Sequence, residues 1–138
     1  MLNFKIGDTE LYPLADSSEK EFTVYSHPES YRVSFRSINQ SFSSNQVVLV
    51  DENVKNLYGI KHDKLISIKP SEDIKSIETV LDICEKLLEF KFDKGNELVV
   101  IGGGITQDLG AYTAKTFKRG IKWTYIPTTL LSQCDSCI

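Results

Sequence analysis

The sequence has no run of apolar residues long enough to cross a bilayer, and its polar start has no signal-peptide core. Cysteine is scarce, and the three cysteines are an odd number without the spacing of a disulfide framework. This favours a reducing compartment. Positive charge is not in excess, because the net charge is -3, which argues against a nucleic-acid-binding surface. We therefore expect a cytoplasmic chain whose partners include neither a membrane nor nucleic acid.

What the chain does have is the composition of one folded domain, with 138 residues of which 41% are hydrophobic and 25% charged. From residue 46 onward, short apolar runs alternate with helix-like patterns, which predicts βαβ units and a parallel sheet. Residues 21–25 and 31–35 alternate polar and apolar side chains around a turn, which predicts a hairpin. We expect an α/β fold, a Rossmann-like parallel sheet flanked by helices with an N-terminal β-hairpin. Residues 1–20 would be a leader, and 21–138 the domain.

The chain is organised around the stretch from Leu98 to Gly110, where a buried-strand pattern meets three glycines and continues as a helix. Glycine lets a ligand approach the backbone closely, and the N-terminus of a helix attracts a phosphate. One interpretation is a dinucleotide pyrophosphate over Gly102–Gly104. The other is a tight turn with no ligand, since a lone glycine cluster is a weak motif.

Other loops follow predicted strands and would therefore meet the glycines at one edge of the sheet. Asp51 can bond ribose hydroxyls or cap a helix, and both interpretations stay open. Ser71 is expected to cap a long helix that ends near residue 90. On that helix, Glu72 and Lys75 can form an exposed ion pair or contact the nucleotide.

Three further features have both a structural and a functional interpretation. Asp108, in the first turn after the glycines, can simply be a carboxylate that interacts favourably with the helix dipole. Arg119 is either a solvated loop residue or a fork for a phosphate. Cys134 and Cys137 have CxxC spacing, but no second cysteine pair or nearby histidine completes a site, so we expect no metal ligands here.

Three segments together resemble the 3-dehydroquinate synthase family: GGGITQDLG at 102–110, FKRG at 117–120 and IPTTLLSQCDS at 126–136. The resemblance extends upstream through 50–54 and the Glu72-x-x-Lys75 pair, and other sugar-phosphate cyclases are the nearest relatives of that family. It implies an NAD-binding α/β domain that precedes a helical domain with the catalytic metal, zinc or cobalt.

The resemblance also implies roles for individual residues. Contacts with the NAD ribose, adenine, pyrophosphate or nicotinamide are implied for Asp51, Asn53, Glu72, Lys75, Gly103, Gly104, Ile105, Asp108, Thr128, Thr129 and Leu131. Asp135 would face both NAD and the substrate. Arg119 would reach the substrate phosphate of a neighbouring subunit in a homodimer.

The reaction implied by the resemblance converts a seven-carbon sugar-acid phosphate, DAHP, to 3-dehydroquinate, a step of the shikimate pathway to aromatic amino acids. NAD transiently oxidises a ring hydroxyl, and phosphate is then eliminated. Departures at Thr106-Gln107 and Cys137 leave open another cyclase substrate, sedoheptulose 7-phosphate or glucose 6-phosphate. The chain ends at Ile138, where the family continues into the metal-binding domain. We therefore expect a fragment that is inactive alone, and a non-catalytic nucleotide-binding module is the alternative.

Overall fold

A computed structural model describes residues 4–6, 9–11, 20–25, 27, 30–35, 38 and 41–136. The chain divides into two compact units, one at residues 1–37 and the other at 38–138. The sequence patterns place the first boundary after residue 20 instead. The candidate site lies entirely in the second unit.

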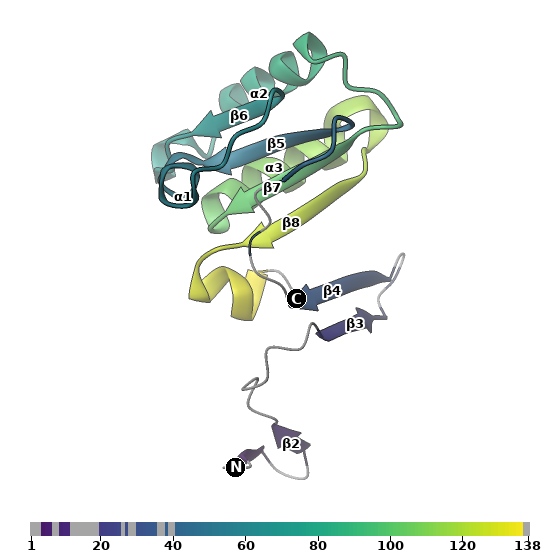
Figure 1. Ribbon diagram of the computed structural model, residues 1–138, viewed down its shortest axis with the longest axis vertical. Coiled ribbons are helices and arrows are strands. Elements are labelled where there is room, and N and C mark those ends of the chain that lie inside the picture. Colours follow the sequence, from purple (N-terminus) through teal and green to yellow (C-terminus); the bar gives the residue numbers. More distant parts are fainter. Residues whose placement is uncertain are drawn as a thin grey trace. The chain divides into compact units, whose positions relative to one another are not determined.

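The first unit contains two antiparallel strand pairs (Figure 1). They are β1 (Phe4–Ile6) with β2 (Thr9–Leu11), and β3 (Lys20–Val24) with β4 (Tyr31–Phe35). The second pair confirms the predicted hairpin, and the first lies in the stretch expected to be a leader. Across β3 and β4, Ser34 Oγ donates to Glu21 Oε1 at 3.0 Å, and the Arg32 guanidinium lies 3.9 Å from the same carboxylate. These polar pairs suit an exposed ribbon.

The second unit is built on a four-stranded sheet whose order is β6-β5-β7-β8 (Figure 1). The strands are β5 (Gln46–Asp51), β6 (Leu65–Ile68), β7 (Glu97–Gly102) and β8 (Trp123–Pro127), and every pairing is parallel. The continuously apolar β5 and β7 occupy the centre because only there are both faces of a strand buried. The parallel sheet confirms the fold class expected from the sequence.

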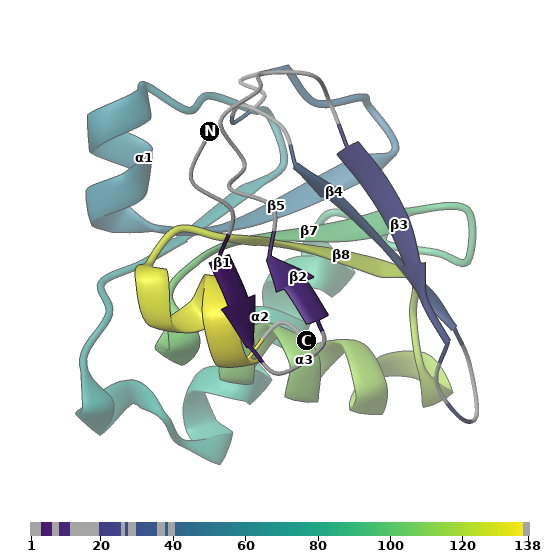
Figure 2. The ribbon, with the colours of Figure 1, turned by 90° about the horizontal axis from the view of Figure 1, so that it is seen from below.

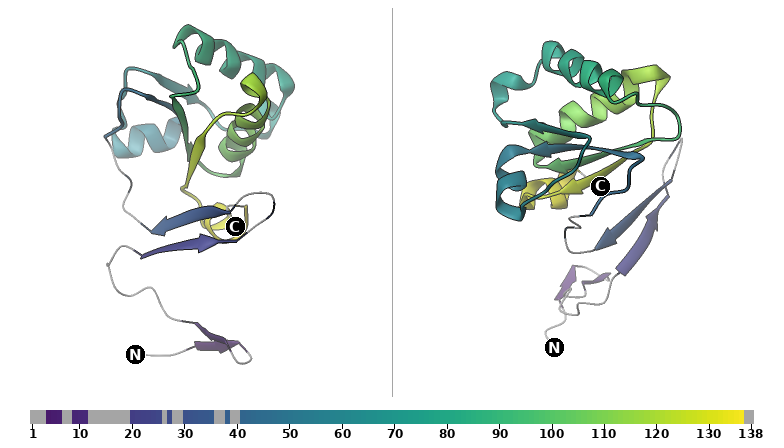
Figure 3. Two further views of the ribbon diagram at one scale, coloured as in Figure 1. Left: turned by 90° about the vertical axis from the view of Figure 1, so that its right-hand side faces the viewer. Right: turned by 45° about the horizontal axis from the view of Figure 1, so that its top comes forward.

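Helices cover both faces of this sheet, with α1 on one side and α2 and α3 on the other (Figures 2 and 3). The helices are α1 (Glu52–Tyr58), α2 (Ile77–Glu89) and α3 (Gly104–Thr116). Alternate residues of a strand point to opposite faces. Val47 and Leu49 therefore join the core under α2 and α3, whereas Val48 and Val50 pack with Val54 of α1. None of the helices in the described ranges is both long and apolar enough to span a membrane.

The long helix expected from Ser71 is two separate pieces. Ser71 precedes only a short 3-10 helix, η1 (Glu72–Ile74), and its side chain makes no capping bond. Lys75 has φ -73° and ψ 69°, which are not helical values. The cap of α2 is Ser76, whose Oγ accepts the N–H of Thr79 at 3.3 Å. The break leaves Lys75 on a loop instead of on the side of a helix.

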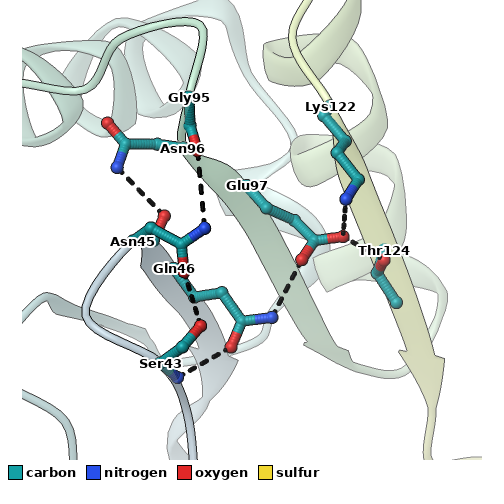
Figure 4. Close-up of polar contacts among 8 residues, drawn as sticks. All are labelled: Ser43, Asn45, Gln46, Gly95, Asn96, Glu97, Lys122 and Thr124. Atoms are coloured by element: carbon teal, nitrogen blue, oxygen red, sulfur yellow. Dashed lines mark hydrogen bonds and ion pairs between the residues drawn. The ribbon is translucent and has the colours of Figure 1, made fainter.

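At the amino edge of the sheet, a polar network joins the three strands β5, β7 and β8 (Figure 4). The carboxylate of Glu97 accepts bonds from Gln46 Nε2 at 2.8 Å and Thr124 Oγ1 at 2.7 Å, and Lys122 Nζ lies 3.5 Å away. Burial alone would raise the pKa of Glu97, but these donors and the lysine charge outweigh it, and the pKa falls below its ordinary value. Glu97 is therefore held as a carboxylate.

Candidate functional site

The carboxyl ends of all four strands meet at one edge of the sheet, as the arrowheads in Figure 1 show. The loops after β5, β6, β7 and β8 hold nearly all of the predicted site residues. Those at this edge are Asp51, Asn53, Glu72, Lys75, Gly103, Gly104, Ile105, Asp108, Thr128, Thr129, Leu131 and Asp135. Arg119 is the exception, because it follows the end of α3 and precedes the start of β8, which places it at the opposite, amino edge.

The N-terminus of α3 differs from those of the other two helices. Asp51 caps α1 and Ser76 caps α2, each through a side-chain oxygen. The N-cap of α3 is Gly103, and no side chain in the described part of the chain caps this helix. The first N–H groups of a helix have no partner within the helix itself, so those of α3 are available to an anion.

The three glycines of the turn have different structural roles. A Cβ on Gly102 would lie 2.5 Å from Thr106 Oγ1, and a Cβ on Gly103 would lie 2.9 Å from Thr129 Cγ2. Both glycines are therefore needed for close packing against neighbouring side chains. A Cβ on Gly104 would meet no atom of the described residues within 4 Å. Gly104 is thus the point where a ligand can reach the backbone.

Hydrogen bonds from the end of β8 and the loop after it hold the glycine turn in place. The carbonyl of Gly102 accepts the Thr128 N–H at 2.9 Å and the Tyr125 O–H at 3.0 Å. Thr129 Oγ1 bonds Ser132 Oγ at 2.8 Å, and Ser132 is 1% exposed. These bonds bring the predicted residues Thr128 and Thr129 beside the glycines.

Sequence reasoning missed three residues that build this corner. Tyr125 and Ser132 act through the bonds just described, and Thr106 packs under Gly102 as a fully buried side chain. Thr106 Oγ1 has no hydrogen-bond partner within the described ranges. Of the three, only Ser132 could have been found from the sequence, because it follows Thr129 by three residues, which is the spacing of a helix cap.

Asp51 forms the helix cap that was one of its two interpretations. Its Oδ1 accepts the N–H of Asn53 at 2.7 Å and that of Val54 at 3.4 Å. Its Oδ2 accepts no bond from the chain as far as the structure describes it. The cap orients the carboxylate at the carboxyl edge, and the contact with ribose stays a prediction.

An ion pair joins the loop before α2 to the first turns of α3. Lys75 Nζ lies 2.7 Å from Asp108 Oδ2 and 3.8 Å from Glu72 Oε2. The hydrogen bond to Asp108, helped by the charges of both carboxylates, raises the pKa of Lys75 above its ordinary value. The three residues are exposed to solvent, which screens their charges and makes the pairs weak. The structure thus brings Asp108 to the Glu72 and Lys75 pair, which lies far from it in the sequence. Lys75 and Asp108 line a groove of about 340 Å³ between α2 and α3.

The loop that carries Arg119 has an unusual backbone. Lys118 and Arg119 have φ values of 48° and 69°, and the Gly120 N–H bonds the Phe117 carbonyl at 2.9 Å. This is the pattern of a type I′ turn, whose central positions favour asparagine and glycine. A residue with a Cβ loses about 1–2 kcal/mol in the left-handed region. Such strain is concentrated at functional sites.

The segment after β8 presents apolar and acidic side chains to solvent. Leu130 and Leu131 are 77% and 73% exposed. Asp135 lies in the π-helix η3 (Ser132–Ser136), and Cys134 is exposed beside it, whereas Cys137 falls outside the described residues. Within the described ranges, no group of three or more His, Cys, Asp or Glu side chains could hold a metal ion.

A comparison with protein families matches residues 65–138 to the model described as "3-dehydroquinate synthase N-terminal". The match covers more than half of the chain. The chain belongs to the 3-dehydroquinate synthase family. Membership confirms the resemblance that the glycine, RG and PTTLL segments indicated.

Curated relatives of the chain are 3-dehydroquinate synthases. The enzyme of Clostridium acetobutylicum is 38% identical over 112 residues, which are 73% of this chain and 32% of that protein. The enzyme of Clostridium botulinum is 33% identical over 136 residues, 91% of this chain and 39% of that protein. The chain therefore spans between about a third and two-fifths of the length of these relatives.

Solved structures of sugar-phosphate cyclases have the same fold. One is 2-epi-5-epi-valiolone synthase from Streptomyces hygroscopicus subsp. jinggangensis 5008 with NAD+ and Zn2+ bound. It has a TM-score of 0.62 and 27% identity, over 67% of this chain and 29% of that chain. The other is 2-deoxy-scyllo-inosose synthase complexed with carbaglucose-6-phosphate, NAD+ and Co2+. Its TM-score is 0.57 at 24% identity, over 66% of this chain and 28% of that chain, and this likeness concerns the fold alone.

Proposed function

We propose that this chain is the NAD-binding part of a 3-dehydroquinate synthase-like sugar-phosphate cyclase. The observation that supports this best is the uncapped N-terminus of α3, with the open Gly104 at the carboxyl edge of a parallel sheet. A ligand of an open α/β sheet binds at this edge. The NAD+ in the solved valiolone synthase, a structural relative of the chain, agrees with the proposal.

The glycine turn holds the pyrophosphate through the backbone N–H groups of Gly104 and Ile105. A helix terminus alone contributes only about 0.3–1 kcal/mol, whereas micromolar binding needs about 8 kcal/mol. The rest comes from the neighbouring loops: the free oxygen of Asp51 accepts a bond from a ribose hydroxyl, and Thr128 and Leu131 line the cofactor. Six further residues complete the proposed set of NAD contacts: Gly103, Asn53, Glu72, Lys75, Asp108 and Thr129.

The bound NAD supplies transient oxidation of a ring hydroxyl of the substrate. Asp135, on the exposed segment after β8, faces both NAD and the substrate. The substrate is the seven-carbon sugar-acid phosphate DAHP, which is converted to 3-dehydroquinate with loss of phosphate. The metal, zinc or cobalt, belongs to the part of the relatives that this chain does not span, so we expect the chain alone to be inactive.

Arg119 acts on the substrate phosphate from a neighbouring subunit of a cytoplasmic homodimer. The five residues of β8 rise about 3.3 Å each and separate the amino edge from the carboxyl edge by about 17 Å. An arginine side chain is too short to cover that distance. Its position therefore favours action in a second copy over action in its own.

Calorimetry with NAD tests the cofactor, and a phosphate-release assay tests the reaction. The chain alone is expected to bind NAD and to release no phosphate from DAHP. Absence of NAD binding at millimolar concentration would contradict the proposal. Product analysis of the complete gene product, offered DAHP, sedoheptulose 7-phosphate or glucose 6-phosphate, identifies the substrate.

A further inference from the structure

The amino edge of the sheet holds a basic pocket, far from the carboxyl edge where the cofactor is proposed to bind. The pocket has a volume of about 230 Å³ and is lined by Asp93, Lys94, Lys118, Gly120, Ile121 and Lys122. Three lysines and one aspartate thus line the pocket, in a chain whose net charge is -3.

The strained turn fixes the position of the central lysine. Lys118 Nζ donates to the Phe92 carbonyl and lies 5.5 Å from the centre of the Phe117 ring. An ammonium group has three N–H donors, so its bond to the carbonyl leaves others for a ligand. Asparagine or glycine would relax this turn, yet the chain has Lys118 and Arg119 at its two left-handed positions.

The remaining charged groups of the pocket favour an anion. The carboxylate of Asp93 already accepts the Gly95 N–H at 2.8 Å. Lys122 Nζ lies 3.5 Å from Glu97, beyond normal hydrogen-bond length, and its side chain is 74% exposed. Lys122 is therefore able to turn toward a ligand. No ion pair holds Lys94 within the described part of the chain.

We propose that this pocket binds a phosphate oxyanion, either inorganic phosphate or the phosphate group of a monoester. Lysine ammonium groups bind phosphate as point charges. A pocket with three of them suits a small, compact, multiply charged ion. The site is separate from the glycine turn, and the inference does not depend on NAD binding there.

Amide chemical shifts of the 138-residue chain test the pocket. Inorganic phosphate and methyl phosphate are titrated separately at constant ionic strength, with chloride as the balancing ion. We expect saturable shifts at residues 93–95 and 118–122 with at least one probe. Tighter binding of phosphate identifies the free ion as the ligand, and tighter binding of methyl phosphate identifies a monoester.

Matched variants separate the pocket from general charge effects. Lys94→Gln with Lys122→Gln should weaken binding at least about tenfold, without touching the bond between Lys118 and Phe92. Lys61→Gln removes one lysine charge from an exposed loop elsewhere and should leave the affinity unchanged, and Lys94→Gln alone is the variant with the same change of charge. Shifts that do not saturate, that occur at Gly103–Thr106 instead, or that survive the double substitution would overturn the proposal. A chain that fails to bind NAD would still be expected to bind phosphate here.

Discussion

Alanine at Gly104 should weaken cofactor binding without harming the fold. A Cβ at this position meets no described residue within 4 Å, and Gly104 is the first residue of α3, without a positive φ. Alanine is favoured over glycine in a helix by up to about 1 kcal/mol, so the variant should be as stable as the wild type or slightly more stable. The added methyl would nevertheless occupy the space that a pyrophosphate needs.

The expected loss follows from the bonds that the methyl group prevents. One hydrogen bond to a charged group contributes about 1.5–3 kcal/mol, so displacing the pyrophosphate from one N–H should weaken NAD binding by about 10-fold to 100-fold. Calorimetry measures the affinity, and urea unfolding measures the stability. Ala111→Gly, in the same helix, serves as the reciprocal control: it should lower stability by about 0.5–1 kcal/mol and leave the affinity unchanged.

Wild-type NAD affinity in Gly104→Ala would refute the reasoning, because the cofactor would then not approach this backbone. A large loss of stability would refute it differently, by showing that the space above Gly104 is needed for packing. An affinity weakened about 10-fold to 100-fold, with stability retained, is the predicted result.

Three other predictions concern the same unit. Gly110→Ala should cost about 1–3 kcal/mol in urea unfolding, because its Cβ would lie 2.6 Å from Cγ2 of the buried Val100; unchanged stability would contradict the packing. Asp51→Ala should lose about 1 kcal/mol of capping, Asp51→Ser should keep it, and both should weaken NAD binding; a serine variant with full affinity would remove Asp51 from the cofactor site. Glu97 has a pKa below its ordinary 4.5, so its contribution to stability is present above that pH and is lost as the pH falls through the folded pKa. The stability difference between wild type and Glu97→Gln should therefore shrink in acid, and a difference that grows there would contradict this sign.

Much of the fold could be predicted because it follows from burial. The apolar runs at 47–50 and 98–101 predicted strands buried on both faces, and both are central strands of the parallel sheet. The strand-to-helix turn could also be predicted, because the glycines directly follow the apolar run of β7. The prediction that Ser71 caps the long helix was wrong. Serine is a good cap wherever a helix begins, and the sequence does not show that the backbone leaves the helical conformation at Lys75 before α2 starts.

Long-range contacts of the site were harder to predict. The ion pair between Lys75 and Asp108 joins a loop to a helix residue 33 positions later, and no local pattern encodes such a contact. The bond from Tyr125 to Gly102 depends on the register of β7 and β8, which the sequence leaves open. The left-handed backbone at Lys118 could not be foreseen, since it contradicts the preference of lysine and arginine.

A crystal structure of the chain grown with NAD would test the central claim most directly. The quantity to measure is the distance between the backbone N of Gly104 and the nearest pyrophosphate oxygen. A hydrogen bond of about 2.7–3.2 Å is the predicted result. A cofactor bound at the amino edge, or a pyrophosphate out of reach of the glycine turn, would contradict the account.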